Sequence, residues 1–165
     1  MWQTKQFLSI RTKLSTKYNI CFIAWLIAWV LSLLDCSIQN RELEGRLYIL
    51  SINNAQLVYY EKKGKFVTED SPQGWAELAV GRKPGTTNYE YSFHGTKRSV
   101  YSYAITRKEN LKSYVGAVFI VGNPSNETAN LIVCETRSSG FISFLPRPFL
   151  ENGNPTCDSG TVKKY

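Results

Sequence analysis

Four cysteines and a single histidine are the residues whose types could support covalent, metal or redox chemistry. Cys21 and Cys36 stand at either end of an apolar segment, whereas Cys134 and Cys157 lie in the C-terminal part. Neither pair has the Cys-x-x-Cys spacing that is typical of zinc and redox sites. His94 stands alone at the end of a strand-like run, where a surface role is usual for histidine.

Motifs of serine hydrolases, zinc proteases and phosphate loops do not occur in the sequence. The acidic residues are scattered singly or stand in helical charge pairs such as Glu42 and Arg46. We therefore expect a protein that is not an enzyme, with no catalytic residue, cofactor, metal site or small-molecule substrate.

Basic residues interleaved with tyrosines could bind nucleic acid through phosphate contacts and base stacking. They gather near predicted turns: Lys62, Lys63 and Lys65; Arg82 and Lys83; Lys97 and Arg98; Arg107, Lys108 and Lys112. Acidic residues are mixed among them, which favours a solvated rim over a DNA site. Much of the net charge of +7 comes from four basic residues before Asp35, a flank typical of membrane orientation.

The apolar segment covers residues 20–34 and contains no charged residue. As a helix, residues 18–34 would span about 25 Å, a little less than a hydrocarbon core of roughly 30 Å. An uncleaved anchor that leaves the N-terminus in the cytoplasm is our leading interpretation. The main alternative is a processed signal, with lipid attached at Cys36 as one variant. A core helix of a cytosolic protein is disfavoured, because the segment has no polar face.

The segment from Asn40 to Phe66 shows the apolar spacing of a helix. One face is expected to hold Tyr48, Ile52, Ala55 and Tyr59, widened by Leu43, Leu47, Leu50 and Leu57. Two lysines and then Gly64 are typical of a helix C-terminus. The sequence thus predicts one nearly continuous helix from the apolar segment to Gly64.

A short helix and four strands are expected after the long helix. Pro72 suits a first helical turn, which should bury Trp75 and Leu78. The predicted strands are NYEYSFH (88–94), SVYSYAIT (99–106), YVGAVFIVG (114–122) and NLIVCET (130–136). Short polar links favour an antiparallel meander. The predicted class is α+β, with a long N-terminal helix packed on a four-stranded antiparallel sheet.

The segment from Gly140 to Cys157, here called the strap, combines prolines with large apolar residues. Pro146, Pro148 and Pro155 limit regular structure in it. Its apolar residues, which we expect to be buried against the sheet, are Phe141, Phe144, Phe149 and Leu150. A patch that binds a partner is the alternative interpretation.

Several of these stretches resemble the cyanobacterial type IV pilin-like proteins of the G/H type, relatives of type II secretion pseudopilins. The resemblance rests on NNAQLVYYEKKGKFVTE, NYEYSF, LKSYVGAVFIV, LIVCET and NGNPTCDSGT, which are spread over residues 53–161. It implies a pilin-like fold, export from the cytoplasm and association with pili or secretion-type filaments.

The apolar segment departs from that family's assembling members. Those carry glycine followed by Phe-Thr-Leu-Ile-Glu where prepilin peptidase cuts, whereas this block begins KYNICFIAW and holds no carboxylate. We therefore expect no cut by that peptidase and at most a sparse place in a filament.

An exported domain would contain Cys134 and Cys157, so we expect them to form a disulfide. Two separate buried thiols are the alternative.

The predicted organisation is a basic flank with a hydrophobic anchor or signal over residues 1–36 and an exported pilin-like domain over 37–165. The leading function is a non-enzymatic accessory or minor component of a type IV pilus or pseudopilus. The domain would lie in the periplasm or at the cell surface, held at the inner membrane through residues 20–34. The alternatives are a stand-alone exported binding lipoprotein and an adhesin for DNA or surfaces. Other pilin or secretion subunits are the expected partners, and nucleic acid is a weaker candidate.

Overall fold

The structure, a computed structural model, describes the backbone of residues 3–81 and 85–165, with side chains of the first helix at 23–30 and from 36 onward. The chain forms two compact units, Met1–Gln39 and Asn40–Tyr165. Helix α1 (Gln3–Lys63) supplies the described part of the first unit and the opening segment of the second.

In the first unit, α1 carries large apolar side chains that are well exposed. Their exposed fractions range from 41% to 64% at Ile23, Trp25, Leu26, Ile27, Trp29 and Val30. The side chains of residues 20–22 and 31–34, which belong to the predicted membrane segment, lie outside the described residues. Within the described part of the chain, no helix has the length and apolar character needed to cross a membrane.

Helix α1 ends where the sequence predicts. Lys62 and Lys63 occupy its last turn, and Gly64 follows with φ of 65°. The Gly64 N–H donates to the Tyr60 carbonyl at 2.8 Å, which satisfies one of the last carbonyls of the helix. A residue with a Cβ is disfavoured at that dihedral angle, so glycine sets the end of α1.

The face of α1 that packs on the sheet differs from the predicted one. Ile49, Ile52 and the polar residues Asn53 and Gln56 are each 0% exposed. Leu43 and Leu47, expected on the same face, are instead 37% and 49% exposed. The polar pair occupies the buried face because its amides meet backbone groups and a hydroxyl that need partners. The prediction for the two leucines was therefore wrong.

Helix α2 (Pro72–Leu78) confirms the predicted short helix. The Ser71 side chain caps its start by accepting from the Gly74 N–H at 3.1 Å. Trp75 and Leu78 are 2% and 5% exposed, as expected. The Trp75 ring meets Phe93 of the sheet edge-on, with centroids 4.9 Å apart.

A five-stranded antiparallel sheet forms the centre of the second unit, in the order β1-β2-β3-β4-β7. Its strands are β1 (Tyr89–Gly95), β2 (Ser99–Thr106), β3 (Tyr114–Val121), β4 (Thr128–Thr136) and β7 (Thr161–Lys163). The α+β, pilin-like class is confirmed, and the first four strands match the predicted runs closely. The predicted count of four was short by one, because the C-terminal β7 pairs with the edge of β4.

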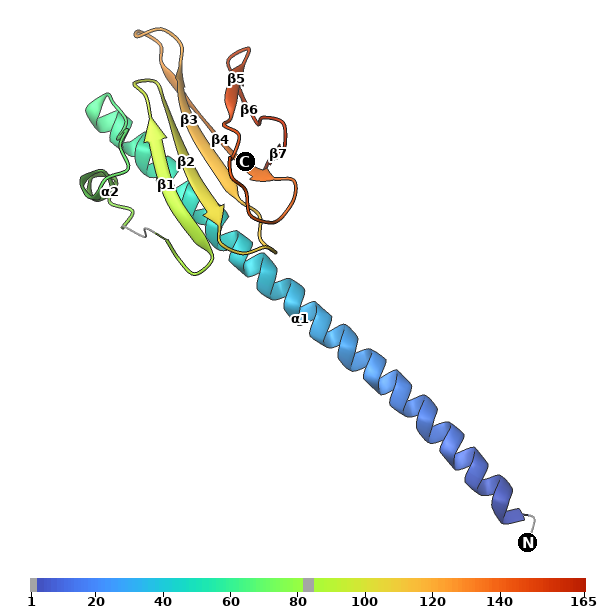
Figure 1. Cartoon of the computed structure of the whole chain (residues 1–165). Helices are drawn as coiled ribbons and strands as arrows, with labels where there is room; N and C mark the ends of the chain where they lie inside the picture. The colour runs from blue at the N-terminus through green and yellow to red at the C-terminus, as the bar shows by residue number, and fades with distance from the viewer. Residues whose placement is uncertain (1–2, 82–84) are drawn as a thin grey trace. The chain divides into compact units, whose positions relative to one another are not determined.

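Helix α1 covers one face of the sheet (Figure 1), and the central strand β3 is buried on both faces, whereas Glu90 and His94 of the edge strand β1 are exposed. On the α1 side, Phe66, Val100, Val118 and Ile120 form a buried cluster with Leu57. The other face forms a second cluster, made of Val115, Ala117, Phe119, Ile132, Cys134 and Leu145. Burial on both faces explains why nearly every residue of β3 is buried.

The strap contains a small hairpin, although its prolines were expected to limit regular structure. Strands β5 (Phe149–Glu151) and β6 (Asn154–Thr156) pair antiparallel, with Leu150 opposite Pro155. The turn uses Asn152 and Gly153, both at positive φ, a pair suited to a tight two-residue hairpin turn. Proline is tolerated here because the pairing is short and lies at an edge.

Candidate interaction surface

Two exposed apolar surfaces of the second unit could bind another molecule. The first, called the helix stripe, consists of Leu43, Leu47 and Val58 on α1, with exposed fractions of 37%, 49% and 47%. These positions follow a helical repeat and lie on the side of α1 opposite Ile49 and Ile52. Leu43 and Leu47 are one turn apart, whereas the exposed Ser51 and Asn54 lie between Leu47 and Val58 on the same side. Large apolar side chains exposed on the outer face of a helix are typical of a site for a second helix.

A groove extends the helix stripe toward α2. Its walls include Ala55, Val58, Leu78 and Val80, and its volume is about 390 Å³. At its edge, the Tyr59 hydroxyl donates to Glu77 at 2.6 Å and ties α1 to α2. This hydrogen bond raises the pKa of Tyr59 and lowers that of Glu77.

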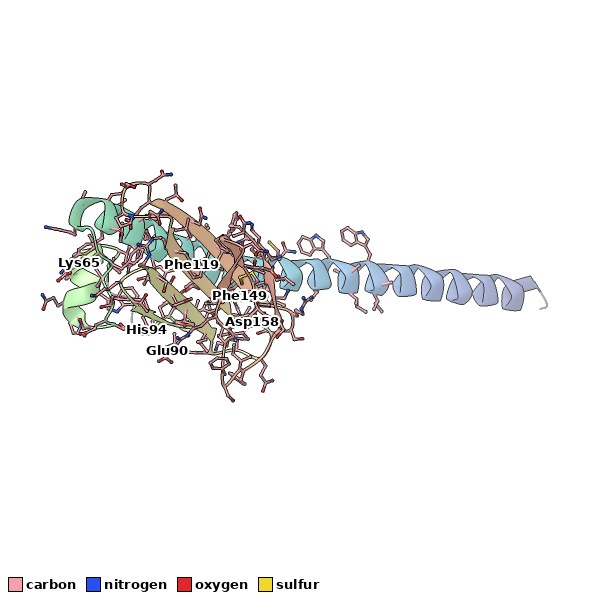
Figure 2. All side chains as sticks on the ribbon, turned by 90° about the horizontal axis from the view of Figure 1, so that it is seen from above. Lys65, Glu90, His94, Phe119, Phe149 and Asp158 are labelled. Carbon is pink, nitrogen blue, oxygen red and sulfur yellow. A yellow bond between two sulfur atoms is a disulfide. The ribbon has the colours of Figure 1, made fainter. Side chains whose placement is uncertain are left out.

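The second surface, called the strap patch, lies on the face of the sheet opposite α1. It consists of Phe141, Phe144, Phe149 and Leu150, with exposed fractions of 65%, 73%, 44% and 39%. The prediction that these side chains are buried was wrong. Leu145, which is 4% exposed, holds the strap to the sheet in their place, together with Ile142. Figure 2 labels Phe149 on the strap and Phe119 on β3.

Two further contacts fix the strap. The structure joins Cys134 of β4 to Cys157 through a disulfide, the pairing expected from the sequence. The Arg147 guanidinium lies over the Tyr101 ring, 5.4 Å from its centroid. The strap patch is therefore presented on a segment held at both its middle and its end.

Three of the basic residues considered for nucleic acid contact carboxylates of the protein. Arg98 contacts Glu127 at 2.7 Å and also donates to the carbonyls of Ile120 and Gly122. Lys112 contacts the buried Glu135 at 2.9 Å, and Arg107 lies 3.5 Å from Glu90. Arg82 and Lys83 lie outside the described residues.

The other chemically active residues are dispersed. His94 is exposed on β1 (Figure 2), across the ladder from Tyr101. Cys36 is exposed on α1, and the side chain of Cys21 lies outside the described residues. Among the described residues, no three His, Cys, Asp or Glu side chains gather as metal ligands would.

Two acidic residues of α1 have roles that the sequence analysis missed. Glu42 accepts from the backbone N–H of Lys112 at 3.2 Å. Glu44 accepts from the Asn88 side chain at 2.8 Å and from the Tyr91 hydroxyl at 3.3 Å. These carboxylates hold two loops against the start of the unit, rather than forming ordinary surface pairs. The positions of Glu42 and Glu44 along α1 did not predict these contacts, because the two loops are distant from them in the sequence.

A comparison with the sequence models of protein families shows the family of this chain. The sequence model of the family described as type IV pilin-like G and H matches residues 42–147. The chain belongs to this family. The match covers the second unit's part of α1, the four long strands and the first half of the strap. No curated protein and no solved structure matches the chain.

Membership accounts for the layout of this pilin-like chain. A long helix on an antiparallel sheet is the expected pilin-like arrangement, and α1 with strands β1 to β4 supplies it within the matched range. Cys157 and the strand β7 lie beyond that range. Pilin-like families are generally non-enzymatic, so the exposed surfaces are the first candidates for a functional site.

Proposed function

We propose that this protein is a non-enzymatic accessory subunit of a type IV pilus or a type II secretion-like pseudopilus. The observation that carries the proposal is the helix stripe of Leu43, Leu47 and Val58, which is exposed on the side of α1 away from its buried face. A pilin-like family supports assembly with other pilin subunits. Association of apolar helix faces is the simplest way to remove this stripe from water.

The proposal includes an inner-membrane anchor over residues 20–34, with residues 37–165 exported as a domain. Its support is the uncharged run in the sequence and the exposure of Trp25, Ile27 and Trp29, each above half. Burying such side chains in hydrocarbon is favourable by about 25 cal/mol per Å² of apolar surface. A basic flank before the segment favours a cytoplasmic N-terminus.

A charge placed in the helix stripe tests the assembly role. Full-length protein carrying Leu47→Lys would be affinity-purified from solubilised membranes of its native cells, and pilin-type partners would be quantified by mass spectrometry. We expect partner recovery to fall roughly tenfold, as for a residue central to an interface. The matched control is Ser125→Lys, an exposed position in the turn between β3 and β4.

Equal partner recovery for both variants would argue against the helix stripe as the assembly surface. Absence of any pilin-type partner from the wild-type sample would remove the assembly role altogether. Thermal unfolding of Leu47→Lys should match the wild type, because Leu47 is half exposed.

Lipid attachment at Cys36 is a competing form of anchoring. It would replace residues 1–35 by a lipid on Cys36, so the intact mass of the native protein separates the two. The full-length mass is expected for the helical anchor. A shorter, lipidated mass would favour the stand-alone exported lipoprotein.

A further inference from the structure

One arginine of the strap is held in place without a carboxylate partner. Arg147 is exposed, and its guanidinium lies over the Tyr101 ring, 5.4 Å from the centroid. Phe119 meets that ring edge-on, with centroids 5.8 Å apart, and so supports it from β3. Among the described residues, no ion pair joins Arg147 to an acidic side chain, whereas Arg98 and Lys112 each have one.

The backbone on either side of Arg147 is fixed as well. Pro146 and Pro148 flank it, and each proline locks its own φ and restricts the residue before it. Pro148 is buried, and so is Leu145, which packs in the second cluster of the sheet. Because the segment is already ordered, binding through this side chain requires little further ordering.

A stacked guanidinium keeps hydrogen-bond donors available. Its N–H groups lie in the plane of the group, so contact through its face leaves its edge free to bind two carboxylate oxygens. The charge-assisted pair that results is among the stronger hydrogen bonds of proteins. Arg147 is therefore suited to a carboxylate that another molecule supplies.

The strap itself contains one carboxylate, Glu151, and it does not pair with Arg147. Glu151 is exposed in β5, and no ion pair joins the two side chains. His94 stands opposite Tyr101 in the β1–β2 ladder, where paired residues share a face, and it adds no negative charge. The surroundings of Arg147 thus leave its charge without a partner.

Two acidic residues near the start of the strap lie far from this arginine. Glu109 belongs to the loop that follows β2, and Glu42 bonds to the backbone of the same loop. Tyr101 lies five residues before Thr106, the last residue of β2, which is about 17 Å along a strand. The guanidinium on Tyr101 is therefore well removed from both carboxylates.

Exposed apolar side chains stand on both sides of Arg147 in the chain. Phe144 precedes it by three residues at 73% exposure, and Phe149 and Leu150 follow it at 44% and 39%. Three residues of extended chain span roughly 10 Å, so these side chains and the arginine belong to one surface. An arginine among exposed aromatic residues is the composition typical of a protein interface. Nucleic acid would require several cations, and the strap supplies one.

We propose that the strap patch, together with Arg147, binds a pilin-type subunit that presents a carboxylate beside apolar side chains. The partner's carboxylate pairs with the Arg147 guanidinium, and the apolar side chains cover Phe144 and Phe149. The inference rests on the assembly role in the proposed function and adds a second contact surface, on the face of the sheet opposite α1.

Photo-crosslinking in the native cells tests this contact. Phe149 of the full-length protein would be replaced by p-benzoylphenylalanine, the cells irradiated, and the adducts mapped by mass spectrometry. We expect an adduct to a pilin-type subunit, at a segment that contains Asp or Glu. Adding Arg147→Gln should lower the adduct yield roughly tenfold. The matched control is Arg137→Gln, at an exposed arginine before the strap, which should leave the yield unchanged.

A charge exchange separates the ion pair from a merely structural role of Arg147 on the Tyr101 ring. Arg147→Glu should lower the adduct yield at least as much as Arg147→Gln. Replacing the mapped Asp or Glu of the partner with arginine should then restore at least half of the wild-type yield. Failure of the exchange to restore any adduct would overturn the pairing.

The remaining outcomes separate this contact from the assembly role on which it rests. Equal yields for Arg147→Gln and Arg137→Gln would overturn the contact alone if Leu47→Lys still lowers recovery of pilin-type partners. Adducts at 149 to lipid, nucleic acid or a second copy of the chain, in place of a pilin-type subunit, would also overturn it. Absence of any pilin-type partner from the wild-type sample would overturn both proposals.

Discussion

The side chain of Gln56 pairs with both backbone polar atoms of Val67. The Val67 N–H donates to Oε1 at 3.0 Å, and Nε2 donates to the Val67 carbonyl at 2.8 Å. Both residues are buried, at 0% and 7% exposure. The Gln56 side-chain amide thus bonds to Val67 as a neighbouring strand would. These two hydrogen bonds fix the position of the segment between α1 and α2.

Replacing Gln56 by leucine should destabilise the protein strongly. Gln56→Leu leaves two buried backbone groups of Val67 without partners, at about 1–3 kcal/mol each. We expect a loss of roughly 2–4 kcal/mol in the free energy of unfolding, measured by denaturant titration of the detergent-solubilised protein. Gln73→Leu, which removes an exposed contact with Glu77, is the matched control and should change it by less than about 0.5 kcal/mol. Equal losses in the free energy of unfolding for Gln56→Leu and Gln73→Leu would contradict the role assigned to Gln56.

Gly45 is required by the close approach of the Tyr89 ring. A Cβ at residue 45 would lie 2.8 Å from Tyr89 Cζ. Gly45→Ala should therefore lower the melting temperature, with an overpacking cost of about 1–3 kcal/mol that outweighs the roughly 1 kcal/mol gained in helix propensity. Ser51→Ala, at an exposed position of the same helix, should leave the melting temperature nearly unchanged. A higher melting temperature for Gly45→Ala would refute the close approach of the Tyr89 ring to Gly45.

Tyr89 should make the protein sensitive to alkali. Burial, followed by the charges of nearby groups, raises its pKa above the ordinary 10.0. Because the folded pKa is the higher one, its contribution to stability is full below about pH 10 and is lost as the pH rises further. Tyr91 and Tyr114 are shifted in the same direction. Tyr89→Phe should make the fall in stability above pH 10 less steep.

The same variant should be more stable at neutral pH. The Tyr89 hydroxyl is buried and has no hydrogen-bond partner among the described residues. Tyr89→Phe removes that unpaired group and should raise the free energy of unfolding by about 1 kcal/mol. Tyr91→Phe, which loses the contact with Glu44, is the comparison and should not stabilise. A destabilised Tyr89→Phe would show that the hydroxyl has a partner in solution.

The disulfide should contribute to stability by restraining the strap. Cys157→Ser opens a link between residues separated by 23 positions, which corresponds to about 3 kcal/mol in the chain-entropy picture. We expect a lower melting temperature and faster proteolysis between Gly140 and Cys157. Full labelling of both thiols in denaturant without reductant would show that the bond is absent.

Residues 37–165 are expected to fold as a separate fragment. Both core clusters of the sheet draw only on residues of the second unit. The fragment should therefore be soluble and monomeric under oxidising conditions, with a melting temperature close to that of the full-length protein. Persistent aggregation in gel filtration would count against this domain boundary.

Local sequence signals determined most of the secondary structure. Gly64 predicted the end of α1, Pro72 the start of α2, and the alternating Tyr89, Tyr91 and Phe93 the strand β1. Each of these signals acts within a few residues, through a permitted dihedral angle or a side-chain period, and is therefore readable without the rest of the chain.

The tertiary structure alone decided which surfaces are covered. Asn53 and Gln56 are buried because segments distant in sequence offer them polar partners, while Leu47 is left exposed. Strand β3 is buried on both faces, so its apolar run did not reveal which side meets α1. Strand β7 and the exposed rings of Phe141 and Phe144 depend on pairings far apart along the chain. Hydrophobicity indicates that a side chain prefers burial, but only the packed fold determines whether a neighbour is present to bury it.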